Sequence, residues 1–258
     1  QLKVFFTFAS PDPNSPTPKL PPLKTSGASN VQQAVFKQYS GSAGLTRRLP
    51  RMASVVGVVA ATALAFGALG WFALSNHVPT ISSEQQMRSS GLSAAWAEGS
   101  VLVLIRHAER CDRSSNVCLN DPTGITVAGS QAAGRVGEGL QRLGLANTAL
   151  LSSTELRTRQ TAQFIFDKPL ATQQWLNDCD GHFADVALSH KQPGQNLALV
   201  THSGCIDQLE RQLHVPGGQR SSAYASALFV AVDGHGKPHI LGQTNAEQWP
   251  RLIAKRGS

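Results

Sequence analysis

The chain has 258 residues, a length that suits one good-sized domain or two small ones. Its formal net charge is +7, but residues 1–51 hold seven Lys and Arg against one acid, whereas the remainder holds sixteen against fifteen. The body of the chain is therefore nearly neutral and has no basic stripe interleaved with aromatic residues, which argues against a nucleic-acid partner.

Residues 1–51 come first along the chain, and their composition is that of a basic, Pro-rich tail. The stretch SPDPNSPTPKLPPLKTSGASN has almost no apolar periodicity, so it cannot bury enough surface to offset the entropy of ordering. Two interpretations remain open. The segment is either a disordered cytoplasmic tail or sequence upstream of the natural start, because the first methionine is Met52.

Residues 52–74 form an uncharged apolar segment that is long enough to cross a bilayer as a helix, which takes about 20 residues. Three arginines lie just before it, and no Lys or Arg follows until Arg88. By the positive-inside rule, the N-terminus stays in the cytoplasm and the body is exported. The segment predicts either a retained inner-membrane anchor or a signal peptide cleaved near Ser75, with a periplasmic body in both cases.

Residues 75–99 are expected to be a polar spacer, and residues 100–258 the folded domain. Short apolar runs predict three strands buried on both faces, at 101–105, 148–152 and 197–201. Helical spacing follows each strand, at 124–144, 155–166 and 206–213. Two late strands, 225–232 and 238–242, are expected to pair antiparallel. The alternation predicts an α/β fold, a three-layer sandwich with a mainly parallel central sheet flanked by helices.

Residues suited to phosphate chemistry follow all three parallel strands. Arg106 and His107 come after the first strand, Arg157 after the second, and His202 and Ser203 after the third. Because sites in such sheets form beyond the carboxyl ends of the strands, we expect these side chains at one edge. Guanidinium groups bind phosphate oxygens bidentately, and a histidine beside two arginines resists protonation and stays nucleophilic. The pattern predicts a phosphoryl-transfer site.

Four motifs in this region resemble those of the histidine phosphatase superfamily. They are LIRHAER, with Ala108 where Gly is commoner, GITVAGSQAA, SSTELRTRQTA and LVTHSG, and together they span residues 101–210. The resemblance implies a phosphoglycerate-mutase-like fold in which His107 is the nucleophile that becomes phosphorylated. It also implies that Arg106, Arg157 and His202 hold the phosphoryl group, and that the chemistry needs no metal ion or cofactor.

The acid that protonates the leaving oxygen is less clearly marked in the sequence. Asp180, in LNDCDGHF, lies between the second and third motifs, where many members of the superfamily place their acid. Glu109 is closer to His107 in sequence, although that position usually has a supporting role in the superfamily. Neither carboxylate need be the acid, in which case His182 or water would serve.

The chain contains four cysteines, Cys111, Cys118, Cys179 and Cys205. An even count in an exported protein predicts disulfides. Cys111 and Cys118 enclose a short polar loop and form the expected local pair, which leaves Cys179 for Cys205. Cross pairings, free thiols and a metal site remain as alternatives, although a metal site would ordinarily use a close Cys-x-x-Cys pair.

The stretch RHAERCDRSSNVCLNDPTGITVAG closely resembles the periplasmic lipopolysaccharide core heptose(II)-phosphate phosphatase family. The resemblance implies an exported phosphomonoesterase whose substrate is a phosphorylated sugar of a glycolipid, and it fades after about residue 165. Two other readings keep the fold and change the substrate: a phosphohistidine-protein phosphatase and a general sugar-phosphate phosphatase. A further alternative is a non-catalytic phosphate-binding envelope protein.

Overall fold

The computed structural model describes residue 62 and residues 77–253. The predicted tail, and the predicted membrane segment apart from Thr62, lie outside the described residues. Within the part that is described, no helix is both long enough and apolar enough to cross a membrane.

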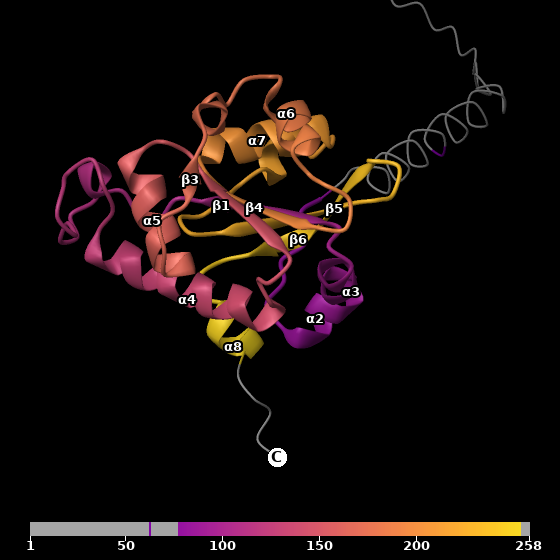
Figure 1. The fold of residues 1–258 in the computed structure, drawn as a ribbon, viewed down its shortest axis with the longest axis horizontal. Helices are drawn as coiled ribbons and strands as arrows, with labels where there is room; N and C mark the ends of the chain where they lie inside the picture. Colours follow the sequence, from indigo (N-terminus) through magenta and orange to yellow (C-terminus); the bar gives the residue numbers. More distant parts are fainter. Residues whose placement is uncertain (1–61, 63–76, 254–258) are drawn as a thin grey trace, which may run out of the picture. The chain divides into compact units, whose positions relative to one another are not determined.

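A mixed sheet, six-stranded within residues 77–253, forms the centre of the domain (Figure 1). Its strand order is β3-β2-β4-β1-β5-β6, and the first four strands run parallel. Strand β5 runs antiparallel to both of its neighbours, β1 and β6, which confirms both the mainly parallel sheet and the late hairpin. The strands are β1 (Val101–Arg106), β2 (Thr148–Ser152), β3 (Ala171–Thr172), β4 (Asn196–Thr201), β5 (Ala227–Val232) and β6 (Pro238–Thr244).

Helices cover both faces of this sheet, as the three-layer prediction requires. Figure 1 shows α6 and α7 on one face and α4, α5 and α8 on the other. The helices are α2 (Glu84–Ser89), α3 (Leu92–Ala97), α4 (Val127–Leu143), α5 (Leu156–Phe166), α6 (Phe183–Ser189), α7 (Ser203–Gln212) and α8 (Trp249–Ile253).

Strand β1 is the centre of the core because its side chains feed both layers. Val103 and Ile105 join a buried cluster with Leu140 of α4, whereas Leu102 and Leu104 join the cluster on the α7 face. This division follows from the period of two residues in a strand. Each such buried side chain contributes about 1.5–3 kcal/mol to folding. The sheet edge beyond β1 is therefore a rigid platform.

The sequence predicts both ends of α4 correctly but not the start of α7. Thr126 caps α4, its hydroxyl accepting from the Gly129 amide at 2.9 Å, and Gly144 ends that helix at φ +92°, as expected. Helix α7 begins at Ser203, three residues before the predicted start. Its first turn consists of small and polar residues, so the apolar spacing that marks a helix begins only at Ile206.

The segment before β1 differs from the polar spacer that the sequence suggested. Leu92 and Trp96 are buried at 0% and 4% exposure, and the Trp96 indole donates to the Gly144 carbonyl at 2.7 Å. Upstream, the Ile81 amide donates to the Gln243 carbonyl at 2.8 Å, which ties the chain to the edge of β6. The folded domain therefore begins well before residue 100. The buried apolar residues of this segment are too few to give the sequence a recognisable helical periodicity.

Candidate active site

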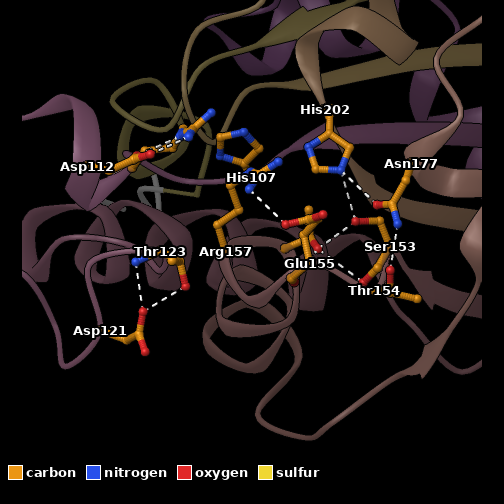
Figure 2. Close-up of polar contacts among 12 residues, drawn as sticks. His107, Asp112, Asp121, Thr123, Ser153, Thr154, Glu155, Arg157, Asn177 and His202 are labelled. Atoms are coloured by element: carbon orange, nitrogen blue, oxygen red, sulfur yellow. Dashed lines mark hydrogen bonds and ion pairs between the residues drawn. The ribbon is translucent and has the colours of Figure 1, made fainter. Parts of the chain in front are cut away.

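Three strand ends bring the predicted residues to one edge of the sheet. His107 follows β1 and His202 follows β4, and these strands pair in parallel with Arg106 opposite Thr201. The two imidazole rings therefore lie next to each other, with centroids 5.4 Å apart (Figure 2). Arg157 enters from the first turn of α5, just beyond β2.

His107 is held in one tautomer by its backbone surroundings. Its ring is buried at 4% exposure, and Nδ1 lies 2.8 Å from the Ala108 carbonyl oxygen. Because a carbonyl only accepts, Nδ1 carries the proton and Nε2 keeps its lone pair. Burial lowers the pKa of His107 to about 3, and His202, Arg157 and Arg106 add to the effect. The imidazole is thus neutral at ordinary pH, as a nucleophile must be.

His202 is oriented by two polar neighbours. Its Nε2 lies 3.0 Å from the Ser153 hydroxyl and 3.1 Å from Oδ1 of Asn177. The Asn177 amide nitrogen donates to Thr154 at 2.5 Å, so its oxygen faces the ring and accepts from Nε2. This arrangement leaves Nδ1 of His202 for a ligand. Burial first, and then Arg157, lowers the pKa of His202 to about 4, while Glu155 opposes the shift.

Arg106 is braced by the loop between α7 and β5. One guanidinium nitrogen donates to the Ser222 carbonyl at 2.6 Å, and the guanidinium carbon lies 3.9 Å from the Tyr224 ring centroid. Stacking of this kind contributes roughly 0.5–2 kcal/mol and fixes the plane of the guanidinium. The Tyr224 ring also lies 5.7 Å from the His107 ring, so it forms one wall of the site.

Both arginines retain capacity for an anion. Arg157 pairs with Glu155 at 3.0 Å through a terminal nitrogen. Among the described residues, the Nε atoms of Arg106 and Arg157 are buried without a hydrogen-bond partner. Buried unpaired donors cost free energy, and a phosphate would satisfy them. Ser203 adds the N-terminus of α7, where the His202 side chain provides no cap, so first-turn amides also suit an anion.

The two carboxylates considered as acids lie in different settings. Glu109 accepts from Thr126 at 2.6 Å, and also from Asn116 and Ser114. These bonds, led by the one from Thr126, lower the pKa of Glu109, which suits an anchor for the loop that follows β1 rather than an acid. Asp180 is exposed and accepts from the backbone amide of His182, itself exposed, at 2.8 Å. Neither shares a described hydrogen bond with a site histidine or arginine.

The cysteines pair as expected, Cys111 with Cys118 and Cys179 with Cys205. The first bridge closes the loop that follows His107. The second joins the first turn of α7 to the loop that supplies Asn177, so it holds Asn177 near His202. All four sulfur atoms are thereby accounted for, and the described residues contain no group of three His, Cys, Asp or Glu side chains that could hold a metal ion.

Several site neighbours were not singled out from the sequence. Ser153 and Glu155 lie inside the SSTELRTRQTA motif but carry no distinguishing pattern of their own. Asn177 is the last residue of a short 3-10 helix (Gln174–Asn177), and Tyr224 lies far along the chain from the other site residues. Only the tertiary fold brings these four residues to the histidines.

Comparison with known proteins places this geometry in context. No protein-family model matches the chain. The lipopolysaccharide core heptose(II)-phosphate phosphatases of Salmonella paratyphi B and Salmonella typhimurium are each 36% identical over 172 residues, which cover 66% of this chain and 84% of the relative. Among solved structures, the protein histidine phosphatase SixA complexed with tungstate has a TM-score of 0.46 at 16% identity, covering 57% of this chain and 97% of that chain. The identity and coverage of the Salmonella proteins show that this chain belongs to the lipopolysaccharide core heptose(II)-phosphate phosphatase family.

Proposed function

We propose that this chain is an exported phosphomonoesterase that removes a phosphate from a heptose of the lipopolysaccharide core through a phosphohistidine at His107. The observation that carries the proposal is the neutral, buried His107 with its Nδ1 proton committed to Ala108, beside His202 and two arginines with unpaired donors. The substrate class comes from the names of the relatives, and the reaction class from this geometry.

The first half-reaction transfers the phosphoryl group to the protein. The lone pair of His107 Nε2 attacks phosphorus, the P–N bond forms, and the bond from phosphorus to the sugar oxygen breaks. The sugar oxygen leaves with the electron pair and takes up a proton. Arg106 and Arg157 stabilise the charge that spreads over the equatorial oxygens, which is where most catalysis of phosphoryl transfer arises.

The second half-reaction returns the protein to its starting state. A water oxygen attacks phosphorus and the water gives up a proton, which balances the one taken up by the sugar oxygen; the P–N bond breaks, and the electron pair goes back to Nε2. His202 presents Nδ1 to the phosphoryl group. A bound dianion favours the protonated form of that ring, whose Nδ1–H then donates a hydrogen bond to a phosphoryl oxygen. The hydrogen bond from Nε2 to Asn177 holds the ring in this orientation throughout.

The compartment is part of the proposal. Two disulfides are typical of an oxidising space, and the relatives are named for a lipopolysaccharide, so we place the domain in the periplasm. Residues 52–74 serve as the export segment, with the N-terminus in the cytoplasm, either retained as an anchor in the inner membrane or cleaved. Thiol titration of the unfolded, unreduced protein recovered from cells should find close to no free thiols. Four free thiols would contradict export.

A direct assay tests the activity. The purified chain should release phosphate from lipopolysaccharide core oligosaccharide that carries heptose phosphate, and His107→Asn should abolish that release. His239→Asn is the matched control, because His239 is exposed on β6. Release that persists undiminished in His107→Asn would overturn the proposed nucleophile. Release from phosphopeptides but not from the core oligosaccharide would overturn the proposed substrate.

A further inference from the structure

Glu155 is a carboxylate at the site that the reaction described above does not use. It occupies the N-cap position of α5, where a polar side chain ordinarily bonds to the free amides of the first turn. The Glu155 side chain makes no such bond. Its backbone is nevertheless fixed, since its carbonyl accepts from the Arg159 amide at 3.0 Å and from the Thr158 hydroxyl at 2.7 Å. A rigid backbone thus presents a side chain that the helix does not need.

The side chain turns toward the phosphate-binding residues instead. Its Oε2 lies 3.0 Å from a terminal nitrogen of Arg157, and Figure 2 shows this pair drawn beside the two histidines. Glu155 also acts electrostatically on His202, where it opposes the lowering of the pKa by burial and by Arg157, and on Arg110, whose pKa is raised chiefly by Asp112 and to a smaller extent by Glu155. Its side chain is 46% exposed, so solvent water reaches the same carboxylate. Glu155 therefore borders both the phosphoryl pocket and the solvent.

The other nearby carboxylates are committed elsewhere. Glu109 holds the loop after β1 through three side-chain partners. Asp112 is bound by the guanidinium of Arg110. Asp121 is bound by the amide and hydroxyl of Thr123. Asp180 bonds within its own turn. Among these, only Glu155 has a phosphate-binding arginine as its partner.

We propose that Glu155 is the proton-transferring residue, the acid for the leaving sugar oxygen and then the base for the attacking water. The inference rests on the proposed phosphatase function and deepens it. In the free protein, Arg157 neutralises the carboxylate. A phosphate dianion that takes over the Arg157 nitrogens leaves the carboxylate beside a like charge, which favours the protonated carboxyl. Substrate binding itself thereby favours the protonated form of Glu155, which can act as the acid.

The proton balance closes over one cycle. As the bond from phosphorus to the sugar oxygen breaks, the electron pair goes to that oxygen and the Glu155 carboxyl gives it a proton. The carboxylate then takes a proton from the attacking water while the water oxygen bonds to phosphorus and the P–N bond breaks. The electron pair returns to His107 Nε2, and Glu155 is protonated again, ready for the next substrate or for exchange with solvent.

The test exploits the leaving group. Glu155→Gln keeps the shape and leaves an amide oxygen for Arg157, but it cannot transfer a proton. With heptose phosphate, whose leaving alkoxide needs a proton, we expect kcat/KM to fall by about 100-fold or more, the usual range for general acid catalysis. With 2,4-dinitrophenyl phosphate, whose leaving group needs none, the first turnover should keep its rate. A burst of about one dinitrophenol per protein should precede a slow steady state, because the base for hydrolysis is missing.

Glu138→Gln is the matched control, an exposed carboxylate on α4, and it should change neither substrate's kinetics. An equal loss on both substrates in Glu155→Gln would assign Glu155 a structural role and overturn the proposal. A leaving-group-dependent loss in Asp180→Asn instead would overturn it in favour of Asp180. Failure of the phosphatase function itself would look different, because the unmodified protein would then turn over neither substrate.

Discussion

The two sides of the site are built in contrasting ways. The phosphoryl side consists of residues at the ends of buried strands, and His107 is held by the backbone of β1 and β4 and is almost inaccessible. The segments that surround it, residues 110–126 and 173–182, consist mostly of loops, and each is bound by a disulfide. From this contrast we expect the reaction to depend on the sheet and the fit to the acceptor sugar to depend on the loops.

Removing a guanidinium from the phosphoryl side should have the largest effect. Arg157→Ala should lower kcat/KM by about 100- to 1,000-fold, the range seen when one stabilising donor is lost. Steady-state kinetics with heptose phosphate measure it. Arg211→Ala, which removes an exposed arginine with 61% side-chain exposure farther along α7, is the control and should be silent. Similar losses of kcat/KM in the two variants would contradict a specific role for Arg157 in binding the phosphoryl group.

Removing each disulfide in turn should have different effects on stability and on kcat. Cys179→Ala with Cys205→Ala opens a bridge of sequence separation 26, and Cys111→Ala with Cys118→Ala one of separation 7. Chain-entropy reasoning predicts stability losses of roughly 3.5 and 2.4 kcal/mol. Denaturant unfolding measures both. The first variant should also lower kcat, because the bridge holds Asn177 near His202. Unchanged kcat in the first variant would show that the bridge is not needed to hold Asn177 near His202.

Acid should destabilise the phosphoryl side through its histidines. The pKa of His107 is lowered to about 3 and that of His202 to about 4, from an unfolded value near 6.5. Between these values the unfolded chain binds protons that the folded chain does not, so this contribution to stability is lost as pH falls from about 6.5 toward 3.

The experiment on this point compares urea unfolding at pH 7 and pH 5 in the unmodified chain and in His107→Asn. Glu210, whose pKa is raised to about 7 by burial, opposes the trend over the same range, and it cancels in the difference between the two proteins. The unmodified chain should lose more stability on acidification than the variant. Identical losses would mean that His107 is not kept neutral by the fold.

Disturbing the orientation of His202 should have the smallest effect of these four. Asn177→Ala removes the acceptor at 3.1 Å from Nε2 but leaves the Ser153 hydroxyl at 3.0 Å. We expect kcat to fall about 10-fold, the equivalent of roughly 1.4 kcal/mol, with little change in KM. Asn177→Asp, which keeps an oxygen acceptor, should restore part of the activity. A change confined to KM would indicate a role in sugar binding instead.

The same contrast explains what could be read from the sequence. The strands, the order of layers and the edge where Arg106, His107, Arg157 and His202 meet follow from apolar runs and from the polar residues at their ends. The cysteine pairs follow from spacing in the first case and from elimination in the second. These features depend on local patterns, which a single sequence displays.

The remaining features depend on contacts between distant segments. Asn177 reaches His202 across 25 positions, and Arg106 donates to Ser222 across 116 positions. Nothing in the local sequence distinguishes these residues from other loop residues. The direction of the Glu155 side chain and the packing of Trp96 under the sheet are likewise tertiary outcomes, so the acid and the start of the domain were not visible.

Trapping the phosphorylated protein tests the proposed nucleophile most directly. The chain is mixed with 2,4-dinitrophenyl phosphate for milliseconds, quenched in alkali, where phosphohistidine survives, and digested for mass spectrometry. We expect one phosphoryl group per protein, on the peptide that contains His107, and none in His107→Asn. A phosphoryl group on another residue, or rapid turnover with no phosphorylated protein at any time, would contradict it.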